Sequence, residues 1–246
     1  MNDRRREFLS VVIPAYNEEL RIGDTLRRTY DWLRARFDRF EIVVVDDGST
    51  DRTAGIVREF ALRSPDVRLL QSPTNIGKGH AVRTGMLAST GDYALFSDAD
   101  LSTPIEELEP ALALLTRGHA VAIASRALPD SNVQVHQGVL RETMGKIFNG
   151  IVRRLCRLPF RDTQCGFKCY SRDAAKAIFL RARIDGFAFD VESLVIARRL
   201  GLSVADFPVR WINSPSSKVH MLRDPVQMIW EVVQVVRNER RGIYDR

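Results

Sequence analysis

Short apolar runs alternate with helix-like segments through the first half of the chain, and this alternation limits the possible fold more than any other feature. Predominantly apolar runs occupy residues 9–13, 40–45, 67–70, 93–97 and 120–124. Segments with helical apolar spacing lie between them, at residues 20–37, 53–62, from 79 onward and 105–117. Strands that alternate with helices favour a mostly parallel sheet with helices on both faces. The sequence therefore predicts an α/β fold.

Three polar clusters directly follow apolar runs. They are PAYNE at residues 14–18, DDGS at 46–49 and DAD at 98–100. In open parallel sheets, ligands bind beyond the carboxyl ends of the strands. We therefore expect the three clusters to meet at one edge of the sheet and to form a binding site there.

The third cluster places two carboxylates two residues apart. Successive side chains on an extended segment point to opposite sides, so Asp98 and Asp100 share a face. Hard oxygen ligands favour Mg²⁺ or Mn²⁺. An isolated Asp-x-Asp is also compatible with a solvated strand end, so the assignment depends on the neighbouring clusters.

Composition narrows the class of protein. The 246 residues are 45% hydrophobic, and 37 basic against 31 acidic residues give a net charge of +6. This balance suits an anionic partner, but neither a zinc-finger spacing nor an RNA-binding aromatic signature is present, which argues against nucleic acid. No apolar stretch reaches the roughly 20 residues that span a bilayer, so we expect a cytoplasmic chain without a transmembrane segment. Three cysteines are too few for a disulfide framework and are expected to be reduced.

The motifs of the first half resemble the donor half of family 2 glycosyltransferases. The resemblance rests on VIPAYNE (12–18), VVDDGSTD (44–51), NIGKG (75–79) and SDAD (97–100). Later motifs, DTQCGFK (162–168) and FDVE (189–192), look like those of polyprenyl-phosphate glycosyltransferases, particularly the dolichyl-phosphate glucosyltransferase type. The resemblance implies a GT-A fold. It also implies a nucleotide-sugar half at 8–126, an acceptor half of the same domain at 127–222, and a C-terminal helix and tail at 223–246.

For the donor side, the resemblance implies a metal-dependent, inverting transfer of a hexose, with glucose from UDP-glucose as the first expectation. Carboxylates are suited to accept hydrogen bonds from the base and the ribose, and a cation is suited to the diphosphate. The implied donor-binding residues are Pro14, Ala15, Tyr16, Glu18, Asp46, Asp47, Lys78 and Asp98. Asp100 is the implied ligand of Mg²⁺ or Mn²⁺.

For the acceptor side, the resemblance implies a polyprenyl or dolichyl phosphate. A phosphate monoester is largely dianionic at neutral pH, so it requires cations rather than a general base. Arg126, Arg141 and Lys218 are the candidates that would bind it. Asp162 and Asp190 are expected either to act as a base or to orient the basic residues, although each could also stabilise a local turn or helix start.

One departure leaves the sugar open. LSTP at 101–104 follows Asp100, where the glucosyltransferase pattern usually has Gly-Ala-Thr, and it is nearer the mannosyl-type version. Ser102 could be a weak metal ligand or a helix N-cap. One alternative is therefore another donor such as GDP-mannose. Two further alternatives are a soluble hydroxyl acceptor and a nucleotide-sugar-binding module without turnover.

The last predicted helix, at residues 224–237, has an apolar stripe that arginines follow. Val226, Ile229, Trp230, Val233 and Val236 recur at helical spacing. This pattern is typical of a helix that lies at a membrane interface, and equally of a helix packed on the sheet. The first alternative predicts peripheral attachment to the cytoplasmic face of a membrane, either directly or through a separate membrane partner.

Overall fold

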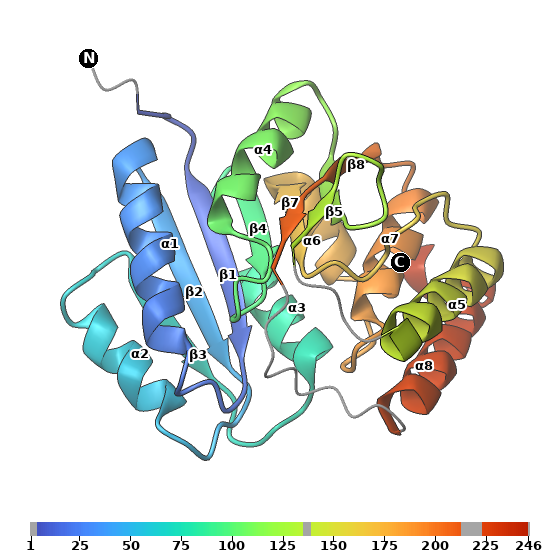
Figure 1. The fold of residues 1–246 in the computed structure, drawn as a ribbon, viewed down its shortest axis with the longest axis horizontal. Coiled ribbons are helices and arrows are strands. Elements are labelled where there is room, and N and C mark those ends of the chain that lie inside the picture. The colour runs from blue at the N-terminus through green and yellow to red at the C-terminus, as the bar shows by residue number, and fades with distance from the viewer. Residues whose placement is uncertain (1–3, 135–138, 213–222, 246) are drawn as a thin grey trace.

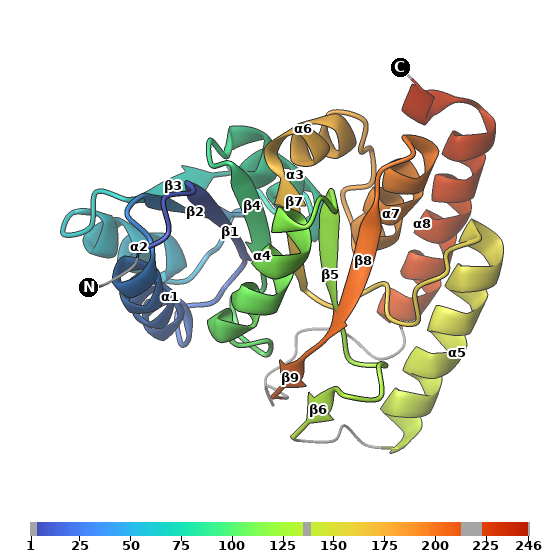
Figure 2. The ribbon, with the colours of Figure 1, turned by 90° about the horizontal axis from the view of Figure 1, so that it is seen from above.

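The computed structural model describes residues 4–134, 139–212 and 223–245, and its core is a seven-stranded sheet (Figures 1 and 2). The strand order is β3-β2-β1-β4-β7-β5-β8. The strands are β1 (Leu9–Ala15), β2 (Phe40–Asp46), β3 (Val67–Gln71), β4 (Tyr93–Ser97), β5 (Val121–Ser125), β7 (Phe167–Ser171) and β8 (Val204–Pro208). A separate parallel pair joins β6 (Asn132–Val133) to β9 (Arg210–Trp211). Because every sheet pairing except those of β7 is parallel, the predicted mostly parallel α/β fold is confirmed.

Helices cover both faces of the sheet. Alternate residues of β1 separate the two cores: Val12 packs on one side, and Val11 and Ile13 pack on the other. The first side is covered by α3 (Lys78–Ala88), α6 (Arg172–Phe179) and α7 (Phe189–Arg199). The second side is covered by α1 (Ile22–Arg36), α2 (Thr53–Ala61) and α4 (Leu108–Thr116), which follows a short 3₁₀ turn at Ile105–Glu107.

Two long helices complete the fold at the far end from α1 and α2 (Figure 1). They are α5 (Val139–Cys156) and α8 (Arg223–Arg240), and a 3₁₀ turn at Ile243–Asp245 follows α8. The expectation that the last helix packs on the sheet is wrong, because α8 packs against α7 and α5 instead. Within the three described segments, no helix combines the length and the apolar character needed to cross a membrane.

The sequence pattern did not predict β7 and α6, which lie in the second half of the chain. β7 inserts antiparallel between β4 and β5, and α6 follows it directly. The physical reason is Lys168, the second residue of β7, which interrupts the apolar run yet is fully buried in the structure. The prediction for the cysteines is confirmed, because Cys156, Cys165 and Cys169 are free and buried.

Gly85 lies where α3 crosses β1 and β2. Substitution of this residue tests how tightly α3 packs on the sheet. A Cβ at Gly85 would lie 2.3 Å from Val12 Cγ1 and 2.9 Å from Val45 Cγ2, whereas a Cβ at Gly55 of α2 meets nothing within 4 Å. We expect Gly85→Ala to lower the free energy of unfolding by about 1–3 kcal/mol through overpacking. Gly55→Ala should raise it by about 0.5–1 kcal/mol through helix propensity. Urea unfolding of both variants measures the difference, and equal stability would contradict this account.

Candidate active site

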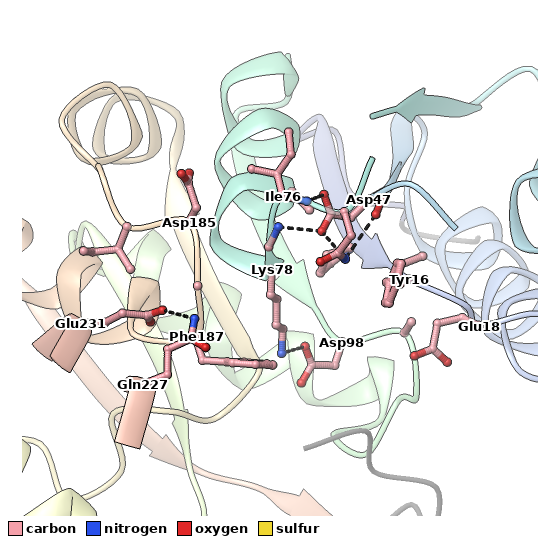
Figure 3. A pocket seen from close by; sticks show the side chains of 18 of the residues that line it. Tyr16, Glu18, Asp47, Ile76, Lys78, Asp98, Asp185, Phe187, Gln227 and Glu231 are labelled. Atoms are coloured by element: carbon pink, nitrogen blue, oxygen red, sulfur yellow. Dashed lines mark hydrogen bonds and ion pairs between the residues drawn. The ribbon is translucent and has the colours of Figure 1, made fainter. Parts of the chain in front are cut away.

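A pocket of about 1030 Å³ opens at the carboxyl edge of β1, β2 and β4 (Figure 3). One wall comes from the segments that follow these strands and from the start of α3, and the other comes from the 183–187 loop and α8. Because parallel strands present their carboxyl ends on one side, the three polar clusters meet here as expected. The predicted residues that line the pocket are Pro14, Ala15, Tyr16, Glu18, Asp47, Lys78, Asp98 and Asp100.

Asp46 is the predicted donor residue that does not line this pocket. Its side chain is fully buried, and its carboxylate accepts hydrogen bonds from the Ser49 backbone N–H (3.1 Å) and from Gln71 Nε2 (3.0 Å). Neighbouring residues at a strand end point to opposite sides, so only one of the two adjacent carboxylates can face the pocket. Asp46 therefore stabilises the turn after β2, and the expectation of a direct donor contact is corrected.

Asp47 ties the loop after β2 to the start of α3 (Figure 3). Its carboxylate accepts hydrogen bonds from the backbone N–H groups of Ile76 (3.1 Å) and Gly77 (2.8 Å) and from Asn75 Nδ2 (2.9 Å). Gly77 has φ +140°, and a Cβ there would lie 2.3 Å from the Asp185 carbonyl oxygen. A glycine is required at this position, since it has both the conformation and the close approach that side chains prevent.

Lys78 places a positive charge in the pocket, beside the carboxylate of Asp98 (Figure 3). Its Nζ lies 2.7 Å from Asp98 Oδ1 and 5.5 Å from the centre of the Phe96 ring. Burial lowers the pKa of Lys78, but the negative charges of Asp98 and Asp190 outweigh burial and raise the pKa above its ordinary value. The ammonium group therefore remains charged at neutral pH.

The carboxylates of the third cluster fit a divalent ion that is shared with a substrate. Asp98 and Asp100 line the same pocket, and Asp100 Oδ1 accepts a hydrogen bond from the Ser102 backbone N–H (2.9 Å). Among the described residues, no group of three or more His, Cys, Asp or Glu side chains could hold a metal. Mg²⁺ is commonly bound by one or two carboxylates together with substrate phosphates, so two carboxylates are sufficient. The N-cap alternative for Ser102 is wrong, because Pro104 precedes the first turn.

Arg126 and Asp162 form a two-pronged ion pair next to β5. Arg126 Nε and Nη2 donate to the Asp162 carboxylate at 2.7 and 2.9 Å, and the Arg126 backbone N–H donates at 3.0 Å. Burial raises the pKa of Asp162, but Arg126 outweighs it and brings this pKa to about 2. A carboxylate with so low a pKa is a weak base at neutral pH, so the geometry favours an orienting role for Asp162. Neither residue lines the pocket described above.

Asp190 belongs to a second buried ion pair, which it forms with Lys168. Its carboxylate accepts a hydrogen bond from Lys168 Nζ, which also donates to the Cys165 carbonyl oxygen (2.7 Å). Burial raises the pKa of Asp190, and the charges of Lys168 and Lys78 oppose this increase. Of the two predicted roles, the geometry again favours orientation of a basic residue.

The structure gives less information on the two remaining acceptor candidates. Arg141 lies in α5, which ends beside α8, and only its backbone is described. Lys218 lies outside the described residues. Their roles remain predictions.

The second wall of the pocket contains residues that the sequence analysis missed. From α8 come Gln227, Trp230, Glu231 and Gln234. Glu231 is buried and accepts hydrogen bonds from the Ala188 backbone N–H and from Gln227 Nε2, both at 2.9 Å. A Cβ at Gly186 would lie 1.9 Å from Glu231 Oε1, so this glycine allows the loop to approach the carboxylate. The sequence did contain one signal for this wall: Glu231 is an acidic residue on the same helix face as the apolar residues Val232 and Val235.

Comparisons with solved structures define the class of fold. The chain superimposes on glucosyl-3-phosphoglycerate synthase from Mycobacterium tuberculosis, solved with Mn²⁺ and UDP-glucose, with a TM-score of 0.66. The match has 23% identity and covers 94% of this chain and 80% of that one. Mannosyl-3-phosphoglycerate synthase from Rubrobacter xylanophilus gives a TM-score of 0.69 at 21% identity, over 96% and 75% of the two chains. These likenesses confirm the predicted GT-A fold.

Sequence comparisons define the family. Residues 10–179 match glycosyl transferase family 2. A dolichyl-phosphate beta-glucosyltransferase of Trichomonas vaginalis is 36% identical, over 96% of this chain and 73% of the relative. The protein of the same name from Saccharomyces cerevisiae is 34% identical, over 98% and 78%, and that from Homo sapiens is 35% identical, over 88% and 71%. The chain therefore belongs to glycosyl transferase family 2, as the motifs predicted.

The Arg126–Asp162 pair predicts a pH-dependent contribution to stability. Because the folded pKa of Asp162 is depressed to about 2, its contribution is present above the unfolded pKa and is lost as the pH falls toward 2. Asp162→Asn should lower the free energy of unfolding by about 2 kcal/mol from pH 7 to about pH 5, and the effect should shrink below about pH 4.

Urea unfolding across this pH range measures the effect. Asp31→Asn, at an exposed position of α1, is the matched control and should change the free energy of unfolding by less than about 0.5 kcal/mol. A deficit of the Asp162 variant that stays constant down to pH 3 would contradict the ion-pair account.

Proposed function

We propose that this chain is a glucosyltransferase that moves glucose from UDP-glucose to a polyprenyl phosphate of the dolichyl type. The main support is the convergence of Tyr16, Asp47, Lys78, Asp98 and Asp100 on one pocket. A nucleoside diphosphate requires groups for the base and ribose at one end and positive charge at the phosphates. The names of the relatives at 34–36% identity support glucose and dolichyl phosphate as the transferred sugar and the acceptor.

In this proposal the donor lies along the first wall of the pocket. The nucleoside contacts residues 14–18 and Asp47, and the diphosphate lies near Lys78 and the 98–100 carboxylates. Mg²⁺ or Mn²⁺ held by Asp100, with Asp98 beside it, would offset the negative charge on the departing diphosphate. Lys78 adds a fixed positive charge to the same region, where low solvent access strengthens its effect.

The acceptor phosphate attacks the anomeric carbon of glucose directly. A phosphate oxygen forms the new bond to this carbon while the bond to the UDP oxygen breaks, and the configuration inverts. The acceptor is already deprotonated at neutral pH, so no general base is required. The absence of a general base agrees with the ion-paired states of Asp162 and Asp190. In this proposal the acceptor phosphate is bound by Arg126, Arg141 and Lys218.

The division of the chain follows from the same proposal. We assign residues 8–126 to the donor, 127–222 to the acceptor, and 223–246 to the C-terminal helix and tail. All three parts line the pocket through residues 14–100, 183–187 and 227–234, so they work as one unit. A polyprenyl phosphate resides in a bilayer, which places the reaction at a membrane surface. The three free cysteines favour its cytoplasmic face.

The first test measures transfer directly. The protein is incubated with radiolabelled UDP-glucose, Mg²⁺ or Mn²⁺ and a polyprenyl phosphate in detergent, and the label in the organic phase is counted. We expect transfer by the wild type and a loss of about 100-fold or more in Asp100→Asn. Asp24→Asn, at an exposed position of α1, should retain full activity. Label from GDP-mannose but not from UDP-glucose would instead support a mannosyl donor, and label on a soluble hydroxyl acceptor would contradict the lipid assignment.

The second test separates diphosphate recognition from nucleoside recognition. Lys78→Met should weaken UDP binding by about tenfold or more, because a charged contact to phosphate is lost, and should leave uridine binding nearly unchanged. Titration calorimetry measures both affinities, and Lys176→Met on the exposed surface of α6 is the matched control. Equal loss of UDP and uridine affinity would place Lys78 outside the diphosphate site.

A further inference from the structure

The helix α8 has apolar side chains on two opposite sides. Val232 and Val235 are fully buried against the neighbouring helices. Ile229, Trp230 and Val233 are 40%, 61% and 51% exposed. At 3.6 residues per turn these three residues fall on one side of the helix, and we call them the outer face of α8. Core packing explains the first side and leaves the outer face unexplained.

The adjacent helix α5 also exposes apolar side chains. It packs beside α8 at the same end of the molecule (Figures 1 and 2). Near its C-terminal end, Ile151 and Leu155 are 39% and 46% exposed. Two neighbouring helices therefore both expose large aliphatic side chains, which differs from the scattered single exposures expected of an ordinary surface.

The exposed charges on these helix segments have one sign. On residues 149–157 and 227–241 the exposed charged side chains are Arg153, Arg154, Arg157, Arg237, Arg240 and Arg241. The two acidic residues in these segments do not offset them, because Glu231 is buried and Glu239 pairs with Arg198. Arginines beside aliphatic and indole side chains are complementary to anionic headgroups above an acyl region.

The outer face is continuous with the pocket through Trp230. Its indole lines the pocket and, among residues 227–240 of α8, is also the most exposed large apolar side chain. Tryptophan is enriched at the boundary between lipid and water, where its ring is apolar and its N–H is polar. A surface that seats Trp230 at this boundary brings the rim of the pocket to the headgroup level.

We propose that the outer face of α8, with Ile151 and Leu155 of α5, docks directly on an anionic lipid bilayer. In this arrangement the two helices lie on the membrane plane, the arginines contact lipid phosphates, and the pocket opens where a lipid-borne phosphate would reach it. The use of this opening rests on the proposed function, whereas the docking itself does not. A second copy of the chain is a less suitable occupant, because the six exposed arginines on each copy would repel one another. A membrane protein would need a matching acidic surface to bind here.

Vesicle flotation tests the docking. The wild type should float with vesicles of phosphatidylcholine mixed with phosphatidylglycerol, and much less with phosphatidylcholine alone. The double variant Ile229→Glu with Val233→Glu should lose about tenfold or more of this binding, since two charges enter the apolar face. Neither position lines the pocket, and both are exposed, so the fold should be retained.

The control changes two leucines that are even more exposed, at the other end of the molecule. Leu20 precedes α1 and Leu62 follows α2, and they are 91% and 87% exposed. Leu20→Glu with Leu62→Glu should float like the wild type. Arg237→Gln with Arg240→Gln should remove the preference for anionic vesicles, whereas Arg34→Gln with Arg63→Gln, at exposed positions of the donor half, should not.

Two acceptors separate failure of the docking from failure of the proposed function. The Ile229/Val233 variant should transfer glucose normally to a short, water-soluble isoprenyl phosphate and poorly to a long-chain polyprenyl phosphate in vesicles. If the wild type transfers glucose to neither acceptor, the proposed function is refuted. The docking is then tested by vesicle flotation alone. The docking proposal is overturned if the wild type does not float with anionic vesicles, or if the Ile229/Val233 variant floats as well as the wild type.

Discussion

Negative charge gathered at one edge of the sheet must be compensated inside the protein, and much of the structure follows from this requirement. Asp98, Asp162 and Asp190 approach the same region from different parts of the chain, and a buried carboxylate without a partner is costly. Each has a cation from a distant segment: Lys78 for Asp98, Arg126 for Asp162 and Lys168 for Asp190. The first pair joins α3 to the segment after β4, the second joins the segment after β5 to the segment before β7, and the third joins β7 to α7.

The pairing of these carboxylates with cations also places a positive charge in the pocket, where an anionic ligand can bind. Asp98 and Lys78 are adjacent before any ligand binds, and Asp190 lies close enough to raise the pKa of Lys78. The positive charge is therefore in position at the start of the reaction, and little reorganisation is required when a diphosphate enters. Carboxylates also fix the 183–187 loop. Glu192 accepts hydrogen bonds from the backbone N–H groups of Arg183 and Ile184, and Glu231 accepts one from the backbone N–H of Ala188.

Local sequence predicted the part of the site that depends on local structure. The strands before residues 14–18, 46–49 and 98–100 are predominantly apolar runs, and parallel pairing brings their ends together. The sequence could not separate Asp46 from Asp47, because which carboxylate faces the pocket depends on the register of β2. Residues Arg126 and Asp162 were both predicted as functional residues, but their pairing across 36 positions is a tertiary contact. β7 was missed because burial of Lys168 is possible only with Asp190 beside it.

The C-terminal helix shows why one sequence pattern is compatible with two different interpretations. A stripe of valines at helical spacing describes a helix that packs on the protein and a helix that lies on a membrane equally well. In α8 the apolar residues exceed what one face can bury: Val232 and Val235 fill the contact with the neighbouring helices, and Ile229, Trp230 and Val233 remain outside. Glu231 lies between the two sets and holds the pocket loop through Ala188. One helix thus links a buried core, a pocket wall and an exposed apolar surface. A carboxylate on its buried side is stable there because it satisfies a backbone donor of the loop that closes the pocket.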